Sequence, residues 1–201
     1  MKKIVALRRP GRPENGRYLS KNNGNIARLG LLPRMFPDSR IVLPVREPLA
    51  HARSLLRQHR NFLGMHREAP FVRRYMADLG HYEFGDVHRP IAFPGLHDLI
   101  AGRDRLTIDY WLAYWVAAFE HVLLHIDGVI VVSYEATCAD PERALTALCA
   151  GLEVDDEGLL PAVAATFRKE PPAARADDGA DSGLRSRAER VYAALMQRRL
   201  Q

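Results

Sequence analysis

Residues 36–59 read FPDSRIVLPVREPLAHARSLLRQH, and this stretch decides the fold class. The apolar run 41–45, rich in β-branched residues, predicts a buried parallel strand. Pro48 stands where the first residue of a helix is expected, and this helix is predicted to end near Asn61. Arg46 falls between the two elements, at the carboxyl end of the strand. Ligands of α/β sheets bind beyond the carboxyl ends of the strands, so Arg46 is a candidate ligand-binding residue.

The rest of the chain continues this alternation of strands and helices. Residues 17–20 predict a short strand, and residues 129–132 predict a second buried strand. Gly and Pro make residues 64–103 irregular, with one helix expected at about 71–79. Further helices are predicted at 26–36 (bent at Pro33), 104–127, 140–150, 156–167 and 184–200. This order predicts an α/β fold in which helices flank a parallel sheet.

Three segments divide the 201 residues. Residues 1–169 form the predicted α/β domain, and residues 170–183, rich in Pro, Ala, Asp and Gly, are a predicted disordered linker. Residues 184–201 hold a C-terminal helix. The longest apolar stretch, 110–126, carries Glu120 and two histidines, which argues against a membrane span. The apolar run 4–7 is too short for a signal peptide, so we expect a cytoplasmic protein.

Charge is distributed unevenly along the chain. Residues 1–74 contain 17 Lys and Arg against 4 Asp and Glu, whereas residues 75–201 contain 12 against 20. A basic first third predicts an anionic ligand or partner. One hypothesis is nonspecific nucleic-acid binding, but the sequence has no recognition motif and no aromatic residues interleaved with the arginines. We therefore expect no nucleic-acid partner. Two cysteines and the absence of an HExxH motif also predict no metal site.

Ser54 stands eight residues after Arg46, within the predicted helix. The free N–H groups at the start of a helix and its positive end attract phosphate. Arginine adds a planar, permanently charged donor, and serine adds a hydroxyl. Arg46, Ser54 and the helix start together predict a site for a terminal phosphomonoester.

The segment 36–59 resembles the sulfotransferases that use 3′-phosphoadenosine 5′-phosphosulfate (PAPS), in which a strand ends in Arg and a Ser follows eight residues later. Upstream, RYLSKNN (17–23) is similar to the family's Lys-containing motif. Downstream, VIVVSYEATCADPERALTALCAGL (129–152) resembles its strand, Tyr-Glu and Asp-Pro signature. The resemblance covers roughly residues 17–152. It implies a P-loop nucleoside-kinase-like sulfotransferase fold.

The resemblance implies transfer of a sulfuryl group from PAPS, as sulfuryl donor, to a hydroxyl or amine acceptor. Arg46 and Ser54 would bind the 3′-phosphate, Tyr134 would lie near the adenine, and Lys21 would contact the leaving oxygen. The late basic pair Arg168 and Lys169 would correspond to further cofactor contacts. The expected acceptor is a small molecule, a carbohydrate or a lipid, and its recognition is expected within residues 64–103. No metal is implied.

Two features depart from the family pattern. The N-terminal Gly-Thr-Thr loop that binds the 5′-phosphosulfate has no counterpart, so we expect a chain truncated at its N-terminus. Many members carry a catalytic His two residues after the Lys, where this chain has Asn23, and the base is therefore unknown. These departures favour an alternative function: a degenerate, non-catalytic domain that binds 3′-phosphoadenosine nucleotides or a protein partner.

Overall fold

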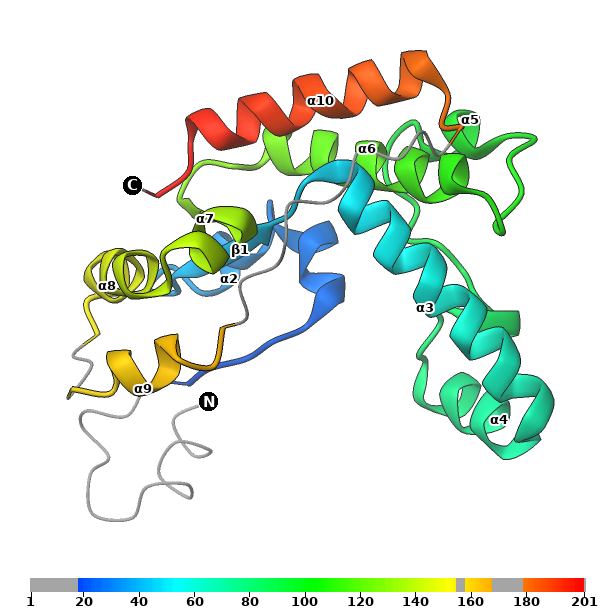
Figure 1. Ribbon diagram of the computed structural model, residues 1–201, viewed down its shortest axis with the longest axis horizontal. Helices are drawn as coiled ribbons and strands as arrows, with labels where there is room; N and C mark the ends of the chain where they lie inside the picture. Colours follow the sequence, from blue (N-terminus) through cyan, green and yellow to red (C-terminus); the bar gives the residue numbers. More distant parts are fainter. Residues whose placement is uncertain (1–17, 155–157, 168–178, 201) are drawn as a thin grey trace.

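The computed structural model describes residues 18–154, 158–167 and 179–200, which form helices around a small parallel sheet (Figure 1). The two strands are β1 (Ile41–Val45) and β2 (Val129–Ser133). The longer helices are α3 (Pro48–Glu68), α4 (Pro70–Leu79), α6 (Ile108–Leu124), α8 (Pro141–Leu152) and α10 (Ser182–Gln197). The short elements are η1 (Asn23–Arg28), α2 (Leu32–Met35), η2 (Gly85–Val87), α5 (Leu96–Ile100), α7 (Tyr134–Ala139) and α9 (Leu160–Ala164).

The sheet confirms the predicted α/β class. Strand β1 pairs with β2 in parallel, in a register that places Ile41 opposite Val129 and Val45 opposite Ser133. Pro44 lacks an N–H group and is tolerated because, among the described residues, β1 is paired on one side only. The chain after α10 lies along the edge of β2 that does not pair with β1. There the Leu200 N–H donates to the Val131 carbonyl at 2.8 Å.

The predicted strand at 17–20 is wrong for its described part. Residues 18–20 are exposed coil, and the side chain of Leu19 is 92% exposed. A lone extended segment forms a strand only when a neighbouring strand accepts its hydrogen bonds, and none lies beside it among the described residues. Arg17 lies outside the described residues.

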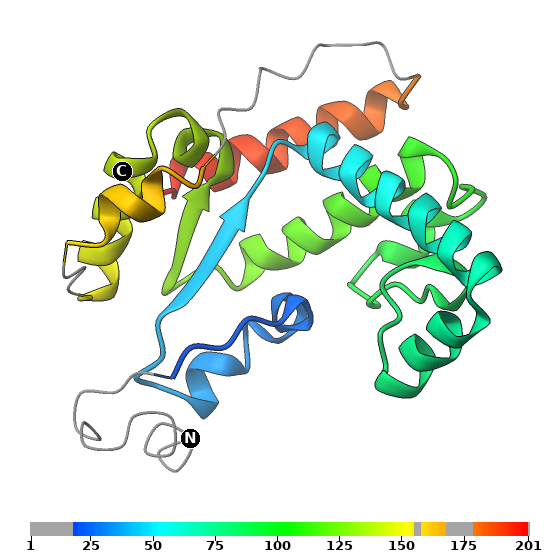
Figure 2. The same cartoon turned by 60° about the horizontal axis from the view of Figure 1, so that its bottom comes forward.

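Helix α6 is the centre of the core. It is apolar on nearly every side, which is typical of a helix that is buried all round. Helix α3 packs on one side of it and α10 on another (Figures 1 and 2). Arg187 of α10 forms a two-pronged ion pair with Glu120 of α6, with N–O distances of 2.7 and 2.8 Å. The C-terminal helix thus contributes to the same core as the sheet.

Helix α3 extends to Glu68, seven residues beyond its predicted end near Asn61. Gly64 costs a helix about 1 kcal/mol relative to alanine. Tertiary contacts offset this cost, because Phe62 stacks on Phe84 at 5.8 Å between ring centroids and His66 is buried against Met76. The region 64–103, expected to be mostly loop, therefore contains the end of α3 together with α4, η2 and α5.

The other helix boundaries agree more closely with the sequence. Asp140 caps α8 by accepting the Arg143 N–H, as its position before Pro141 predicts. Helix α9 is shorter than predicted, and α10 begins at Ser182, within the segment predicted to be disordered. Residues 170–178 of that segment lie outside the described residues. No helix in the described part of the chain has the length and apolar character that a bilayer span needs.

Buried histidines attach the segment around η2 to α3 and α6. The Gly85 N–H donates to His59 Nδ1 at 3.1 Å. His88 donates from Nδ1 to the Glu83 carbonyl at 2.6 Å and accepts at Nε2 from the Tyr110 hydroxyl at 2.9 Å. These bonds require neutral imidazoles, and burial lowers the pKa of His88 to about 4. His51, on α3, has its pKa lowered to about 4 by burial and by the charge of Arg46.

We therefore expect the fold to lose stability in mild acid. The unfolded chain protonates these histidines near pH 6.5, whereas the folded chain does so only near pH 4. The free energy of unfolding keeps its full value above about pH 6.5. Between about pH 6.5 and about pH 4 it falls by about 1.4 kcal/mol per pH unit for each of these histidines. Urea unfolding at about pH 7.5 and about pH 5 measures the slope. His88→Gln should make this loss of stability between the two pH values smaller, whereas His97→Gln, at an exposed position, should not change it. Equal stability of the wild type at both pH values would contradict the prediction.

Candidate functional site

The carboxyl ends of the two strands bring Arg46 and Tyr134 together. Val45 is paired with Ser133, so the residue that follows each strand leaves the sheet at the same edge. The guanidinium carbon of Arg46 lies 4.9 Å from the centroid of the Tyr134 ring, within the range of a cation–π interaction. A permanent cation and an aromatic face thus lie side by side at the edge where α/β proteins bind their ligands.

Ser54 is half-buried on α3, beyond the first turn of the helix. It stands seven positions after Glu47, the N-cap residue. That spacing is about two turns, so Ser54 lies on the same side of the helix as Glu47 and about 10 Å farther along its axis. For one phosphate group to contact both residues, the long Arg46 side chain must therefore reach along this side of α3.

The N-terminus of α3 is occupied by a side chain of the protein itself. The Glu47 carboxylate accepts the N–H groups of Leu49 and Ala50 at 3.0 and 2.6 Å. The next N–H, of His51, donates to the Glu47 carbonyl, and Pro48 has none. The expectation that free helix N–H groups hold a phosphate is therefore wrong for this helix. Any anion here depends on side-chain donors.

Glu135 joins three elements at this edge. Its Oε1 accepts the Glu47 backbone N–H at 2.8 Å, and its Oε2 accepts the Tyr192 hydroxyl of α10 at 3.0 Å. The Ser133 hydroxyl is a third, longer donor to Oε2 at 3.5 Å. Burial and the Glu135 carboxylate raise the pKa of Tyr192 to about 12, so Tyr192 remains a neutral donor. Sequence reasoning noted the Tyr-Glu pair but missed this role of Glu135, and nothing in the local sequence indicates Tyr192.

His51 is a further group that the sequence did not single out. Its imidazole makes an edge contact with Phe119 of α6, with ring centroids 6.2 Å apart. The Nδ1 atom is buried, and no hydrogen-bond partner lies near it in the described part of the chain. With its pKa lowered to about 4, His51 is neutral at pH 7 and adds no charge beside Arg46.

Lys21 lies away from the edge formed by Arg46 and Tyr134. It is exposed coil before η1, and the neighbouring Asn22 caps η1 by accepting the Gly24 N–H at 2.8 Å. After η1, Gly30 lies against His125, close to the start of β2. Figure 2 likewise shows η1 and α2 beside the amino ends of the strands. The structure does not bring Lys21 to the other candidate residues.

The remaining predicted contacts, Arg168 and Lys169, lie outside the described residues. Within the described ranges, no three His, Cys, Asp or Glu side chains gather in a way that could hold a metal ion. His121 and His125 form a ring contact at 4.7 Å between centroids.

Parallel strands with an arginine and an aromatic ring at their carboxyl ends place the chain among the α/β proteins, which bind ligands at this edge of the sheet. Comparison with protein families identifies it further. The model of the sulfotransferase family matches residues 3–158, and the chain belongs to this family. The match includes Arg46, Ser54 and Tyr134, and it confirms the resemblance found in the sequence. No curated protein and no solved structure matches the chain.

Removing Glu135 should weaken the whole sheet edge. Glu135→Ala leaves the Glu47 N–H and the Tyr192 hydroxyl without their acceptor, and we expect the free energy of unfolding to fall by about 2 kcal/mol. Glu189→Ala, an exposed substitution on α10, is the control and should change it by less than about 0.5 kcal/mol. Urea unfolding at neutral pH compares the two variants. Equal stability would show that Glu135 does not hold the edge together.

Proposed function

We propose that the protein transfers a sulfuryl group from PAPS to a hydroxyl or amine acceptor. Membership of the sulfotransferase family supports the reaction class, and members of this family generally use PAPS as donor. The observation that carries the proposal is the meeting of Arg46 and Tyr134 at the carboxyl edge of the sheet, inside the matched range. In this proposal Arg46 and Ser54 bind the 3′-phosphate and Tyr134 contacts the adenine. Lys21, Arg168 and Lys169 supply further contacts.

The residues at the edge are suited to a phosphomonoester. A guanidinium offers paired N–H donors that match two phosphate oxygens, and the Ser54 hydroxyl can donate to a third. The Tyr134 ring that lies under the Arg46 guanidinium offers an aromatic surface for a base. In the reaction, a bond from the acceptor oxygen or nitrogen to sulfur forms, the bond from sulfur to the leaving phosphate oxygen breaks, and the acceptor loses a proton. The chain contributes positioning and charge neutralisation.

A second candidate is a domain that binds 3′-phosphoadenosine nucleotides without transferring sulfate. The position of Lys21 favours it, because this residue lies in an exposed segment apart from Arg46 and Tyr134. Asn23, the first residue of η1, also replaces the expected histidine. Binding and transfer therefore need separate measurements.

Calorimetric titration with 3′,5′-ADP tests the binding site. We expect binding by the wild type and none of 5′-AMP, which lacks the 3′-phosphate. Arg46→Ala should weaken binding about tenfold to hundredfold, as expected for lost hydrogen bonds to a charged group. Arg57→Ala, which removes an exposed arginine farther along α3, should leave the affinity unchanged. Equal binding of both nucleotides, or no effect of Arg46→Ala, would contradict the assigned 3′-phosphate site.

Transfer of labelled sulfate from PAPS to a panel of hydroxyl and amine acceptors distinguishes the two candidates. If the protein is an enzyme, Lys21→Ala should lower the rate of transfer at least tenfold and leave 3′,5′-ADP affinity intact, because the proposed contact is with the leaving oxygen. Arg34→Ala, on exposed α2, is the matched control. Tight 3′,5′-ADP binding without transfer to any acceptor would favour the non-catalytic alternative.

A further inference from the structure

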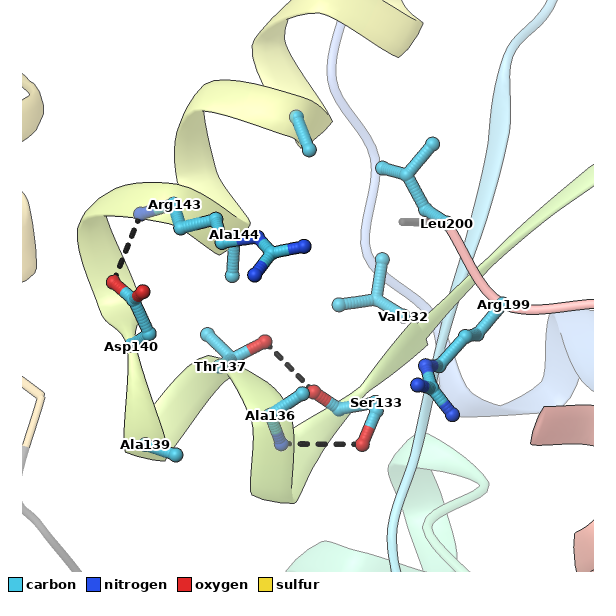
Figure 3. A pocket seen from close by; sticks show the side chains of 11 residues that line it. Val132, Ser133, Ala136, Thr137, Ala139, Asp140, Arg143, Ala144, Arg199 and Leu200 are labelled. Atoms are coloured by element: carbon cyan, nitrogen blue, oxygen red, sulfur yellow. Dashed lines mark hydrogen bonds between the residues drawn. The ribbon is translucent and has the colours of Figure 1, made fainter.

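A separate pocket lies between α7, α8 and the chain that follows α10 (Figure 3). Its volume is about 480 Å³, which is in the range of small-molecule sites. The residues that line it include Ser133 and Val132 of β2 but not Arg46, Tyr134 or Ser54. We name it the α8 pocket. Because Arg46, Tyr134 and Ser54 do not line it, the α8 pocket is distinct from the site proposed for PAPS.

Two arginines from distant parts of the sequence face the α8 pocket. In Figure 3 the guanidinium of Arg143 extends from α8 into the pocket, and the side chain of Arg199 is directed toward the Ser133 side. Neither guanidinium has a hydrogen bond or an ion pair with the described residues. Arg199 is held in place because the next residue, Leu200, donates its N–H to Val131 of β2.

The other polar groups of the pocket already have partners. The Thr137 hydroxyl donates to the Ser133 carbonyl at 2.8 Å, and the Ser133 hydroxyl accepts the Ala136 N–H at 3.2 Å. The Asp140 carboxylate caps α8 through the Arg143 N–H at 3.2 Å. The side-chain donors left for a ligand are therefore the two guanidiniums. The rest of the wall is apolar and is formed by Val132, Ala136, Ala139, Ala144, Ala147 and Leu200.

We propose that the α8 pocket binds a small organic anion. Its apolar ring or chain lies against the alanine-rich wall of α7 and α8, and its sulfate, phosphate or carboxylate group is held by Arg143 and Arg199. Guanidinium groups favour such oxyanions because they offer parallel N–H donors and a permanent charge. Small side chains on α8 leave the space for the apolar part. This site does not depend on the proposed transfer activity.

Calorimetric titration of the full chain with 1-naphthyl sulfate tests the proposal, with 1-naphthyl phosphate and 1-naphthoate as the other anions and 1-naphthol as the neutral analogue. We expect at least one anion to bind and 1-naphthol to bind at least tenfold more weakly. Arg143→Ala and Arg199→Ala should each weaken anion binding at least tenfold. Ala144→Phe, which fills the pocket without changing its charge, should do the same. Circular dichroism checks that each variant is folded.

Arg198→Ala is the matched control, because Arg198 is adjacent to Arg199 but pairs with Asp127 at 3.4 Å outside the pocket. It should leave anion binding unchanged, and 3′,5′-ADP should not displace the bound anion. Three results would overturn the proposal: no anion binds, 1-naphthol binds as tightly as the anions, or binding is insensitive to both Arg143→Ala and Arg199→Ala. Anion binding that is lost in Arg46→Ala and displaced by 3′,5′-ADP would also overturn it. Failure of 3′,5′-ADP to bind would affect only the proposed function.

Discussion

The parallel pairing of β1 (Ile41–Val45) with β2 (Val129–Ser133) is the constraint on which the rest of the structure depends. A chain that leaves one parallel strand must travel the length of the sheet before it can enter the next. Here that crossover contains α3 to α6, and α6 becomes the buried centre of the protein. The same pairing makes both strands end at one edge. Arg46 and Tyr134 meet there because of the backbone register, although 88 positions separate them in the sequence.

The carboxylate of Glu135 joins the hydrophobic core to the carboxyl edge of the sheet. Glu135 accepts hydrogen bonds from the backbone at the start of α3 and from Tyr192 of α10, while α10 is itself fastened to α6 by the pair Arg187 and Glu120. Each of these bonds involves at least partly buried groups, where losing a partner costs more than at the surface. The position of Arg46 is thus set by the packing of the C-terminal helix as well as by the strand that precedes it.

The sequence predicted those parts of the fold that are determined locally. The apolar run 41–45, the proline after Arg46 and the Asp-Pro pair at 140–141 each have one favoured local structure, and each formed it. The sequence also identified Arg46 and Tyr134 as the residues that follow the two strands. The length of α3, the hydrogen bonds of Glu135 and the α8 pocket depend on partners far away in the chain, namely Phe84, Tyr192 and Arg199. Local patterns carry no information about such partners.

The charges at the sheet edge indicate what a 3′-phosphate would need there. Arg46 contributes one positive charge, and Glu47 and Glu135 contribute two negative ones, while His51 and Tyr192 are neutral at pH 7. The net charge of this group is about −1, and a phosphomonoester adds about −2. Binding must therefore recruit cations beyond Arg46, and the further cofactor contacts that the family resemblance assigns, Arg168 and Lys169, would supply positive charge.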